Sequence, residues 1–356
     1  MRHQVKIETL SSVHVGSGEK KVLGIDFLHT LSMIYFLDTL KIGESLNITS
    51  NPQLAGEWSK SVLAGKQERF FYEHNIDYKK YSRSVRNYVK NFSDYAPSIS
   101  MMMRDGRGIA YVPGSSIKGA IRTAFFAQLA KDEIKNVYKK AKDKAMLEPN
   151  RRKSRKIVEE SLKTWAKEFF GKISEDSFRF LRIGDAFFDQ SPMVAVINTV
   201  QIKKSKISPK LADIDSIKQY AEVLLSDNSS EFILNFDEKG FSYNIPRFKD
   251  VKSMFKLIND HTKELVQSEL NYWKDVKGAE SLWNDLDYID GEIEACHDNE
   301  CVLRMGNASG KRFITGGILE RINFDPEAIP KTRRIEILDD DSYALLGFVK
   351  LSLQDD

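Results

Sequence analysis

The segment at positions 111–126, Tyr-Val-Pro-Gly-Ser-Ser-Ile-Lys-Gly-Ala-Ile-Arg-Thr-Ala-Phe-Phe, places the tightest limits on how this chain folds. Residues 109–112 have the pattern of a short strand that stops at a Pro-Gly pair, and the residues after this pair have helical spacing. The apolar residues of this helix recur on one face: Ile117, Ile121, Ala124, Phe125 and Leu129. A strand, a glycine turn and an amphipathic helix in this order predict a helix that lies against a sheet.

The start of this helix has two interpretations. Its small, hydroxyl and cationic residues are Gly114, Ser115, Ser116, Lys118, Gly119 and Arg122. Either serine can cap the helix, and a helix N-terminus with hydroxyls and two cations one turn apart is suited to phosphate. The alternative is an ordinary capped core helix with two solvated cations, and the spacing alone does not decide between them. The sequence differs from the nucleotide-binding P-loop, in which Ser or Thr follows Gly-Lys.

Two more loops combine glycine with nearby cations. Gly16-Ser17-Gly18 follows the apolar strand expected at residues 3–10, and a loop at residues 306–317 follows a second strand-like run. A single glycine-rich loop is usually only a turn. Three such loops in one chain predict a surface that holds the backbone of a nucleic acid through N–H groups and cations, without reading its sequence.

Lysine and arginine are concentrated in residues 131–172, most densely at residues 151–156. A solvated helix face is the simplest explanation for each single cation of such a run, whereas the group as a whole supplies a positive field for a polyanion. The net charge of +3 for the whole chain is too small to indicate a polyanion partner by itself.

The organisation of the chain predicts an α+β protein with two domains. A length of 356 residues exceeds the usual size of one domain. We place the domains at residues 1–205 and 206–356, because each half has strand-like segments, one long helical pattern and a glycine-bearing loop. Residues 41–92 have a mostly helical pattern and are expected to be an insertion in the first domain.

The composition predicts a soluble, cytoplasmic protein. The chain is 41% hydrophobic and 29% charged, and no apolar run approaches the roughly 18 residues of a membrane span. Cys296 and Cys301 give no disulfide framework, which is typical of a reducing compartment. The spacings C-x-x-C and H-E-x-x-H are absent from the sequence, so we predict neither a metal site nor a cofactor.

One histidine is a candidate for catalysis. His14 lies between two valines just before a glycine loop, where a general acid or base for RNA cleavage can stand. The alternative is a structural histidine at the end of a strand. Ser115 and Ser116 lack the G-x-S-x-G context of a hydrolase, so we predict no catalytic serine.

Several segments together resemble the RAMP superfamily of CRISPR effector proteins. They are Val-His-Val-Gly-Ser-Gly-Glu at 13–19, the segment at 104–123, Leu-Arg-Ile-Gly-Asp-Ala at 181–186, the loop at 306–317, and Pro-Lys-Thr-Arg-Arg at 330–334 with Leu-Gly-Phe-Val-Lys-Leu at 346–351. The order of these segments and the chain length resemble a member from type III-A complexes. The segment at 104–123 is the most specific of them.

The resemblance implies two ferredoxin-like, RRM-related modules with a helical insertion. It further implies a non-catalytic subunit that caps the backbone filament of the effector complex and holds the 3′ part of the crRNA. Its partners would be the repeated backbone subunit, the small helical subunit and recruited cellular nucleases that take part in crRNA maturation and antiviral defence. The predicted RNA-contacting residues are His14, Gly16, Ser17, Gly18, Arg104, Gly114, Ser115, Ser116, Lys118, Gly119, Arg122, Gly306, Gly310, Lys311, Arg312, Phe313, Gly316 and Gly317.

Two other functions stay open at this point. One is a metal-independent endoribonuclease that acts on CRISPR repeat RNA, with His14 as its acid or base. The other is a protein–protein adaptor whose basic loops do not bind RNA.

Overall fold

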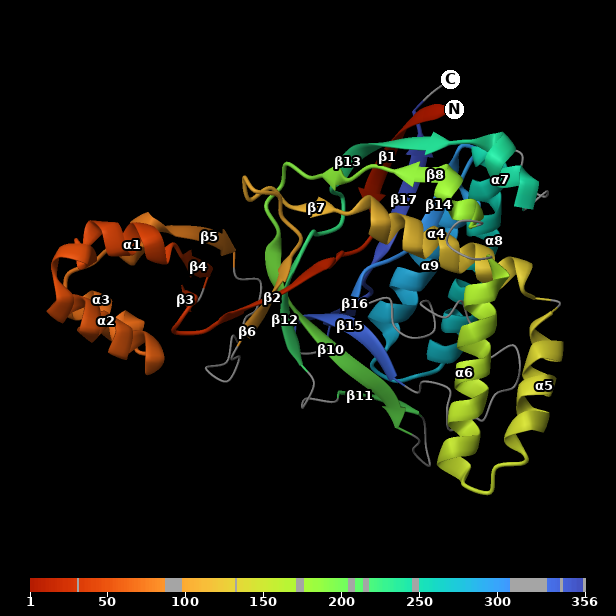
Figure 1. Ribbon diagram of the computed structural model, residues 1–356, viewed down its shortest axis with the longest axis horizontal. Coiled ribbons are helices and arrows are strands. Elements are labelled where there is room, and N and C mark those ends of the chain that lie inside the picture. The colour runs from red at the N-terminus through yellow and green to blue at the C-terminus, as the bar shows by residue number, and fades with distance from the viewer. Residues whose placement is uncertain are drawn as a thin grey trace.

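A computed structural model shows a mixed α and β fold with a main body and a smaller lobe that projects from it (Figure 1). The structure describes residues 1–30, 32–86, 98–131, 133–170, 176–203, 209–213, 218–244, 250–307, 332–339 and 342–354. The N-terminal and C-terminal strands pair with each other, so the two ends of the described chain lie side by side.

The first sheet of the main body has five antiparallel strands, in the order β14-β17-β1-β13-β8. Their bounds are Glu300–Arg304 for β14, Phe348–Leu353 for β17, Arg2–Thr9 for β1, Ser229–Phe236 for β13 and Leu181–Ile183 for β8. Strand β1 confirms the N-terminal strand that the alternation predicted. Val5 and Ile7 are fully buried on its inner face, which explains why the strand lies in the centre of the sheet.

The second sheet has seven strands, in the order β16-β15-β10-β12-β6-β2, with β11 paired to β10. Their bounds are Ser342–Ala344 for β16, Thr332–Asp339 for β15, Met193–Lys203 for β10, Gln219–Val223 for β12, Ser98–Met102 for β6, Gly16–Val22 for β2 and Lys210–Asp213 for β11. Pairing is antiparallel except between β12 and β6. Strands from both sides of residue 205 therefore share each large sheet, and the expected domain boundary crosses both sheets.

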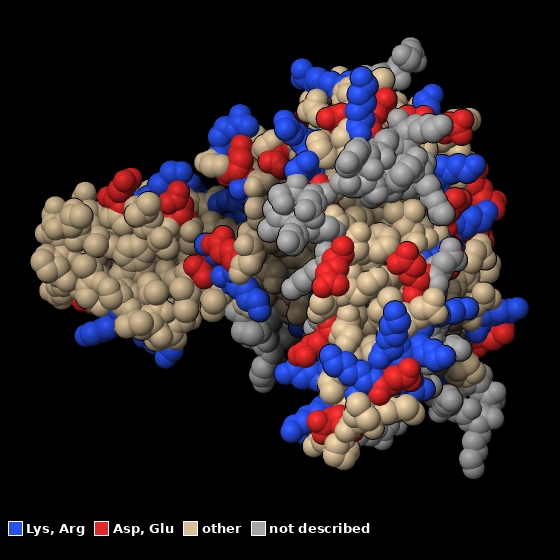
Figure 2. Space-filling view, turned by 45° about the vertical axis from the view of Figure 1, so that its right-hand side comes forward, with Lys and Arg blue, Asp and Glu red and all other residues tan. Residues whose placement is uncertain are grey.

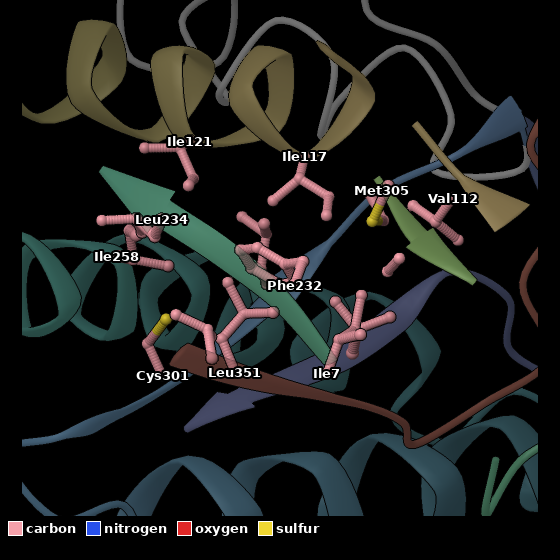
Figure 3. Packing of buried hydrophobic residues seen from close by; sticks show 14 of the residues in the cluster. Ile7, Val112, Ile117, Ile121, Phe232, Leu234, Ile258, Cys301, Met305 and Leu351 are labelled. Carbon is pink, nitrogen blue, oxygen red and sulfur yellow. The ribbon is translucent and has the colours of Figure 1, made fainter. Parts of the chain in front are cut away.

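The helices of the main body are α4 to α9. Their bounds are Gly114–Leu129 for α4, Ile134–Ala145 for α5, Arg151–Phe169 for α6, Glu238–Asn244 for α7, Val251–Trp273 for α8 and Glu280–Glu294 for α9, with a short 3-10 helix η3 at Ser177–Phe180. Helix α4 lies over the first sheet, with Ile117 and Ile121 pointing at its strands (Figure 3). These two side chains meet Ile258 of α8 and Phe232 of β13 in one core, which confirms the predicted helix on a sheet.

The smaller lobe contains the described part of the predicted insertion at residues 41–92, which is mostly helical as expected and differs from the prediction at its C-terminal end. Its helices are α1 at Thr39–Ser45, α2 at Pro52–Leu63 and α3 at Gln67–Glu73, with the short helices η1 at Ile48–Ser50 and η2 at Tyr78–Tyr81. They pack on a three-stranded sheet of β3 at Phe27–His29, β4 at Met33–Leu37 and β5 at Ser82–Arg86. The expected helix is wrong at β5, because Val85 pairs with Ile34 and its burial stabilises the strand. Residues 87–92 lie outside the described residues.

The segment at residues 181–187 passes from one sheet to another. It divides at Gly184 into β8 in the first sheet and a short strand β9, Ala186–Phe187, which pairs with β7, Tyr111–Val112. The division brings Asp185 to the start of α4, where its side chain takes part in the site described below. Within the described residues, no helix is long and apolar enough to cross a membrane.

A buried carboxyl in β15 predicts a pH-dependent stability. Glu336 is 1% exposed, and burial raises its pKa from 4.5 to about 7, with a further rise from the charge of Asp285. Because the folded form keeps its proton while the unfolded form loses it, stability falls by about 3 kcal/mol as pH rises from about 4.5 to about 7 and is constant above that. Urea unfolding midpoints at several pH values measure this, and Glu336→Gln is expected to flatten the curve. An unchanged slope in that variant would contradict the assignment.

Candidate nucleic-acid interface

Described residues from each of the three glycine-bearing loops line one cavity of about 430 Å³. Its walls come from the start of β2, the first half of α4, the middle of α8 and the end of β14. The lining residues are Val15, Gly16, Ser116, Gly119, Ala120, Thr123, His261, Thr262, Leu303, Arg304, Met305, Gly306 and Asn307. We call this cavity the glycine groove. Of the residues predicted from the sequence, it contains Gly16, Ser116, Gly119 and Gly306.

The start of α4 differs from the expectation of a serine cap. Pro113 is the N-cap residue and makes no side-chain cap, while Asp185 accepts a hydrogen bond from the Gly114 N–H at 2.8 Å. The N–H groups of Ser116 and Ile117 donate to the Pro113 carbonyl at 2.9 and 3.2 Å. The Asp185 carboxylate, from the connection between β8 and β9, therefore accepts the first N–H of the helix, where the sequence suggested a phosphate.

Three of the glycines have a packing reason for their identity. A Cβ on Gly114 would lie 2.1 Å from the Ile183 carbonyl oxygen, and one on Gly16 would lie 2.9 Å from Nε2 of His14. Gly306 has φ +85°, and its Cβ would lie 2.6 Å from the His14 carbonyl oxygen. Gly16 and Gly306 allow their segments to lie close to His14, and Gly114 allows the start of α4 to lie close to the backbone of Ile183.

Gly119 is different, because a Cβ there would meet nothing within 4 Å. It lies inside α4 and is exposed at the groove. A glycine in a helix interior costs about 0.5–1 kcal/mol relative to alanine, and neither close packing nor a positive φ accounts for it here. Gly119 therefore leaves its part of the groove lining without side-chain atoms.

The two cations of α4 do not line the groove. The guanidinium of Arg122 forms an ion pair with Asp176 and lies 4.1 Å from the centre of the Phe170 ring. Lys118 is half-buried nearby, and burial lowers the pKa of its ammonium group, with Asp176 opposing this shift. Arg122 therefore has a structural role in this fold, whereas the RNA contact of Lys118 stays a prediction.

His14 lies behind the groove and is 2% exposed. Its Nδ1 lies 2.6 Å from the carbonyl oxygen of Glu222, and burial lowers the pKa of its imidazole. Its own carbonyl oxygen accepts the N–H of Asn307 at 2.9 Å, which ties the β1–β2 connection to the end of β14. A buried imidazole of this kind cannot reach an RNA backbone without rearrangement, so the geometry favours the structural interpretation of His14.

Arg104 belongs to a buried ion network that the sequence did not reveal. Glu222 is fully buried, and its Oε1 accepts from Arg83 at 2.9 Å and from Arg104 at 2.8 Å, while its Oε2 accepts the Met102 N–H at 3.1 Å. Arg83 lies on β5 of the lobe and Glu222 on β12 of the main body. The network therefore ties the lobe to the main body, and the guanidinium of Arg104 is occupied by a protein carboxylate.

These contacts define a groove whose parts come from four separated stretches of the chain. The family model of the RAMP superfamily matches residues 6–292 of this chain. The chain belongs to the RAMP superfamily. This confirms the resemblance that the loops and the segment at 104–123 indicated.

Two solved structures have a similar fold to this RAMP protein. The crystal structure of Csm5 from T. onnurineus has a TM-score of 0.67 and 16% sequence identity, over 97% of this chain and 99% of that chain. A chain in the cryo-EM structure of a Csm-crRNA-target RNA ternary complex from a type III-A CRISPR-Cas system has a TM-score of 0.65 and 17% identity, over 99% of this chain and 100% of that chain. No curated protein matches the sequence significantly.

Arg304 is a groove residue of this RAMP protein that the sequence analysis missed. It is 8% exposed at the end of β14, its Nε donates to the Leu346 carbonyl at 2.8 Å, and burial lowers its pKa to about 10. The guanidinium of Arg334 donates to the side-chain oxygen of Asn307 at 3.1 Å and so orients the rim of the groove. The sequence pattern that could have indicated Arg304 is a single arginine in an apolar strand shortly before a glycine.

The remaining predicted residues fall into two groups. Ser17, Gly18 and Ser115 are exposed, and they lie outside the lining of the groove. The predictions that lie outside the described residues are Gly310, Lys311, Arg312, Phe313, Gly316 and Gly317. In the part of the chain that the structure describes, no group of three or more His, Cys, Asp or Glu side chains is arranged to hold a metal ion.

Proposed function

We propose that this RAMP protein is a non-catalytic crRNA-binding subunit of a type III-A CRISPR effector complex. In this proposal it caps the 3′ end of the complex in the cytoplasm and holds the 3′ part of the crRNA at the glycine groove. It contacts the repeated backbone subunit and the small helical subunit, and it takes part in crRNA maturation through recruited nucleases. The family membership and the fold shared with Csm5 support this assignment.

One observation carries the proposal: Gly16, Gly119 and Gly306, one from each of the three glycine-bearing loops, line one groove, and a side chain at Gly119 would enter open space. Ser116 and Thr123 supply hydroxyls, and Asn307 supplies an amide. Groups of this kind hold phosphate and sugar without distinguishing bases. The RNA is therefore expected to bind with little sequence preference. The two ferredoxin-like modules implied by the family are part of the same proposal.

Gly119→Glu is expected to weaken crRNA binding at least tenfold, about 1.4 kcal/mol, because it adds a carboxylate beside the RNA phosphates. Filter-binding titrations with a labelled crRNA measure the affinity. Gly119→Gln controls for the size of the new side chain and Gly119→Ala for the loss of the glycine, and both are expected to bind more tightly than Gly119→Glu. Equal affinity of Gly119→Glu and the wild-type protein would refute RNA binding at this groove.

Incubation of the purified protein with labelled repeat RNA in EDTA is expected to leave the RNA intact, because His14 is buried. Gel electrophoresis of the RNA after incubation reads the result. Specific cleavage that disappears in His14→Ala would establish the endoribonuclease instead.

A further inference from the structure

The hairpin of helices α5 and α6 has a larger net positive charge than the whole protein. Residues 134–169 contain twelve Lys and Arg against five Asp and Glu, a net charge of +7, whereas the chain of 356 residues carries +3. The other 320 residues therefore have a net charge of −4. The positive field that a polyanion meets on this protein is concentrated in one supersecondary unit.

The cations of α5 face the solvent. Ile134, Ala141 and Ala145 are buried in the contact with α6, so the lysines occupy the outer side of the helix. They are Lys135, Lys139, Lys140, Lys142 and Lys144, all of them exposed. Among the described residues, none of the five has an acidic side chain within 4 Å. Figure 2 shows Lys and Arg side chains gathered over the lower part of the molecule, where the hairpin lies.

Three of these lysines form one stripe. Lys135, Lys139 and Lys142 are spaced four and three residues apart, so they follow one another along the same face of α5 with a rise of about 6 and 4.5 Å. Lysines held in a row without carboxylate partners can each neutralise a phosphate. The cations condensed on the nucleic acid are then released, and this release is the main source of affinity for nucleic-acid backbones.

The hairpin is joined firmly to the helix that lines the glycine groove. The Phe126 ring of α4 lies 5.1 Å from the Trp165 ring and 5.2 Å from the Phe169 ring of α6, measured between ring centres. Aromatic pairs at these distances fix the base of the hairpin on the C-terminal half of α4, while the N-terminal half of α4 lines the groove. The groove and the basic stripe are thus two parts of one rigid unit.

We propose that the outer face of the α5–α6 hairpin is a second RNA-binding surface, which contacts the backbone phosphates of the RNA that leaves the glycine groove. The inference rests on the proposed function, because it takes the polyanion to be RNA. RNA is favoured over an acidic protein as the partner of this surface, because a single RNA strand can follow α4 from the groove to the basic stripe. The contacts are sequence-independent, because lysine ammonium groups meet only phosphates.

The test is the triple variant Lys135→Gln, Lys139→Gln, Lys142→Gln. Its matched control is Lys60→Gln, Lys66→Gln, Lys80→Gln, which removes the same charge from exposed lysines of the lobe. Binding of a labelled, unstructured RNA is titrated at several salt concentrations. Three lost phosphate contacts lower the slope of log affinity against log salt by about 2, and the affinity at 0.1 M salt by roughly 10- to 100-fold. The control is expected to change neither.

Each outcome decides the proposal. A reduced slope in the hairpin variant alone, with an unchanged unfolding midpoint, supports it, and ultraviolet crosslinks from RNA to peptides of residues 134–156 add to that support. Equal losses in both triple variants show a general charge effect and overturn it. Unchanged RNA binding in the hairpin variant, while Gly119→Glu still weakens binding, overturns the hairpin and keeps the groove. A wild-type protein that binds no RNA overturns the hairpin and the proposed function together.

Discussion

Glu222→Gln is expected to destabilise the folded protein by about 3 kcal/mol, because it removes the buried charge that two arginines share. Loss of one partner of a buried ion pair costs about 3–5 kcal/mol when the other charge stays desolvated. Here the side chains of Arg83 and Arg104 are 36% and 17% exposed, so water partly rehydrates them. The expected loss of stability is therefore at the lower end of that range. The midpoint of urea unfolding, followed by circular dichroism, measures the change.

The control for this prediction is Glu44→Gln on α1. Glu44 is exposed, and in the described structure it forms no ion pair within 4 Å. Its replacement is expected to shift stability by less than about 0.5 kcal/mol. Because Arg83 is on the lobe, Glu222→Gln is also expected to increase proteolysis in the connection between lobe and main body. A variant as stable and as protease-resistant as the wild-type protein would show that the network contributes little.

Gly114→Ala is expected to cost about 3 kcal/mol, because the new methyl group would lie 2.1 Å from the backbone oxygen of Ile183. Backbone atoms of β8 cannot change conformation as a flexible side chain can, so α4 must shift away from the sheet. This shift also lengthens the hydrogen bond from the Gly114 N–H to Asp185. The midpoint of thermal unfolding reads the loss.

Gly119→Ala in the same helix provides the matched comparison, with the opposite sign. Its methyl group enters open space, so the lower backbone entropy of the unfolded chain is expected to stabilise the protein by about 0.5–1 kcal/mol. If both variants changed stability equally, the close contact at Gly114 would not be the cause. The comparison of the two variants therefore separates the effect of close packing on stability from the effect of helix propensity.

Much of the secondary structure could be predicted from local pattern. The alternation in residues 3–10 predicted β1, and the apolar spacing after residue 114 predicted α4 with its buried face. The long helical pattern expected in the second half of the chain corresponds to α8. These elements have periodic apolar residues that pack on a core, and the period alone distinguishes helix from strand. Helix α9 was not predicted, although its buried residues Leu282, Leu286, Ile289 and Ile293 recur at helical spacing. Strand β5 has only five residues, too few for a period to distinguish it from the helices that precede it.

The roles of polar residues could not be predicted in the same way. Arg104, Arg122 and His14 were expected at RNA, whereas each makes its main contacts within the protein, with partners far away in the chain. An arginine or histidine has the same appearance in a sequence whether its partner is a phosphate or a buried carboxylate. Glu222, which is 118 residues from Arg104, gave no local signal of its role.

The family is evident from the order of residues along the chain. The strand–glycine–helix unit at residues 111–126 and the basic character of residues 134–169 follow from residues that are close together in the chain. Three features are visible in the folded chain alone: residues of three distant loops line one groove, Asp185 accepts the first N–H of α4, and Gly119 is the groove-lining glycine that faces open space. The physical reason is that packing and charge pairing join residues far apart in sequence, and local periodicity carries no information about which partner each residue meets.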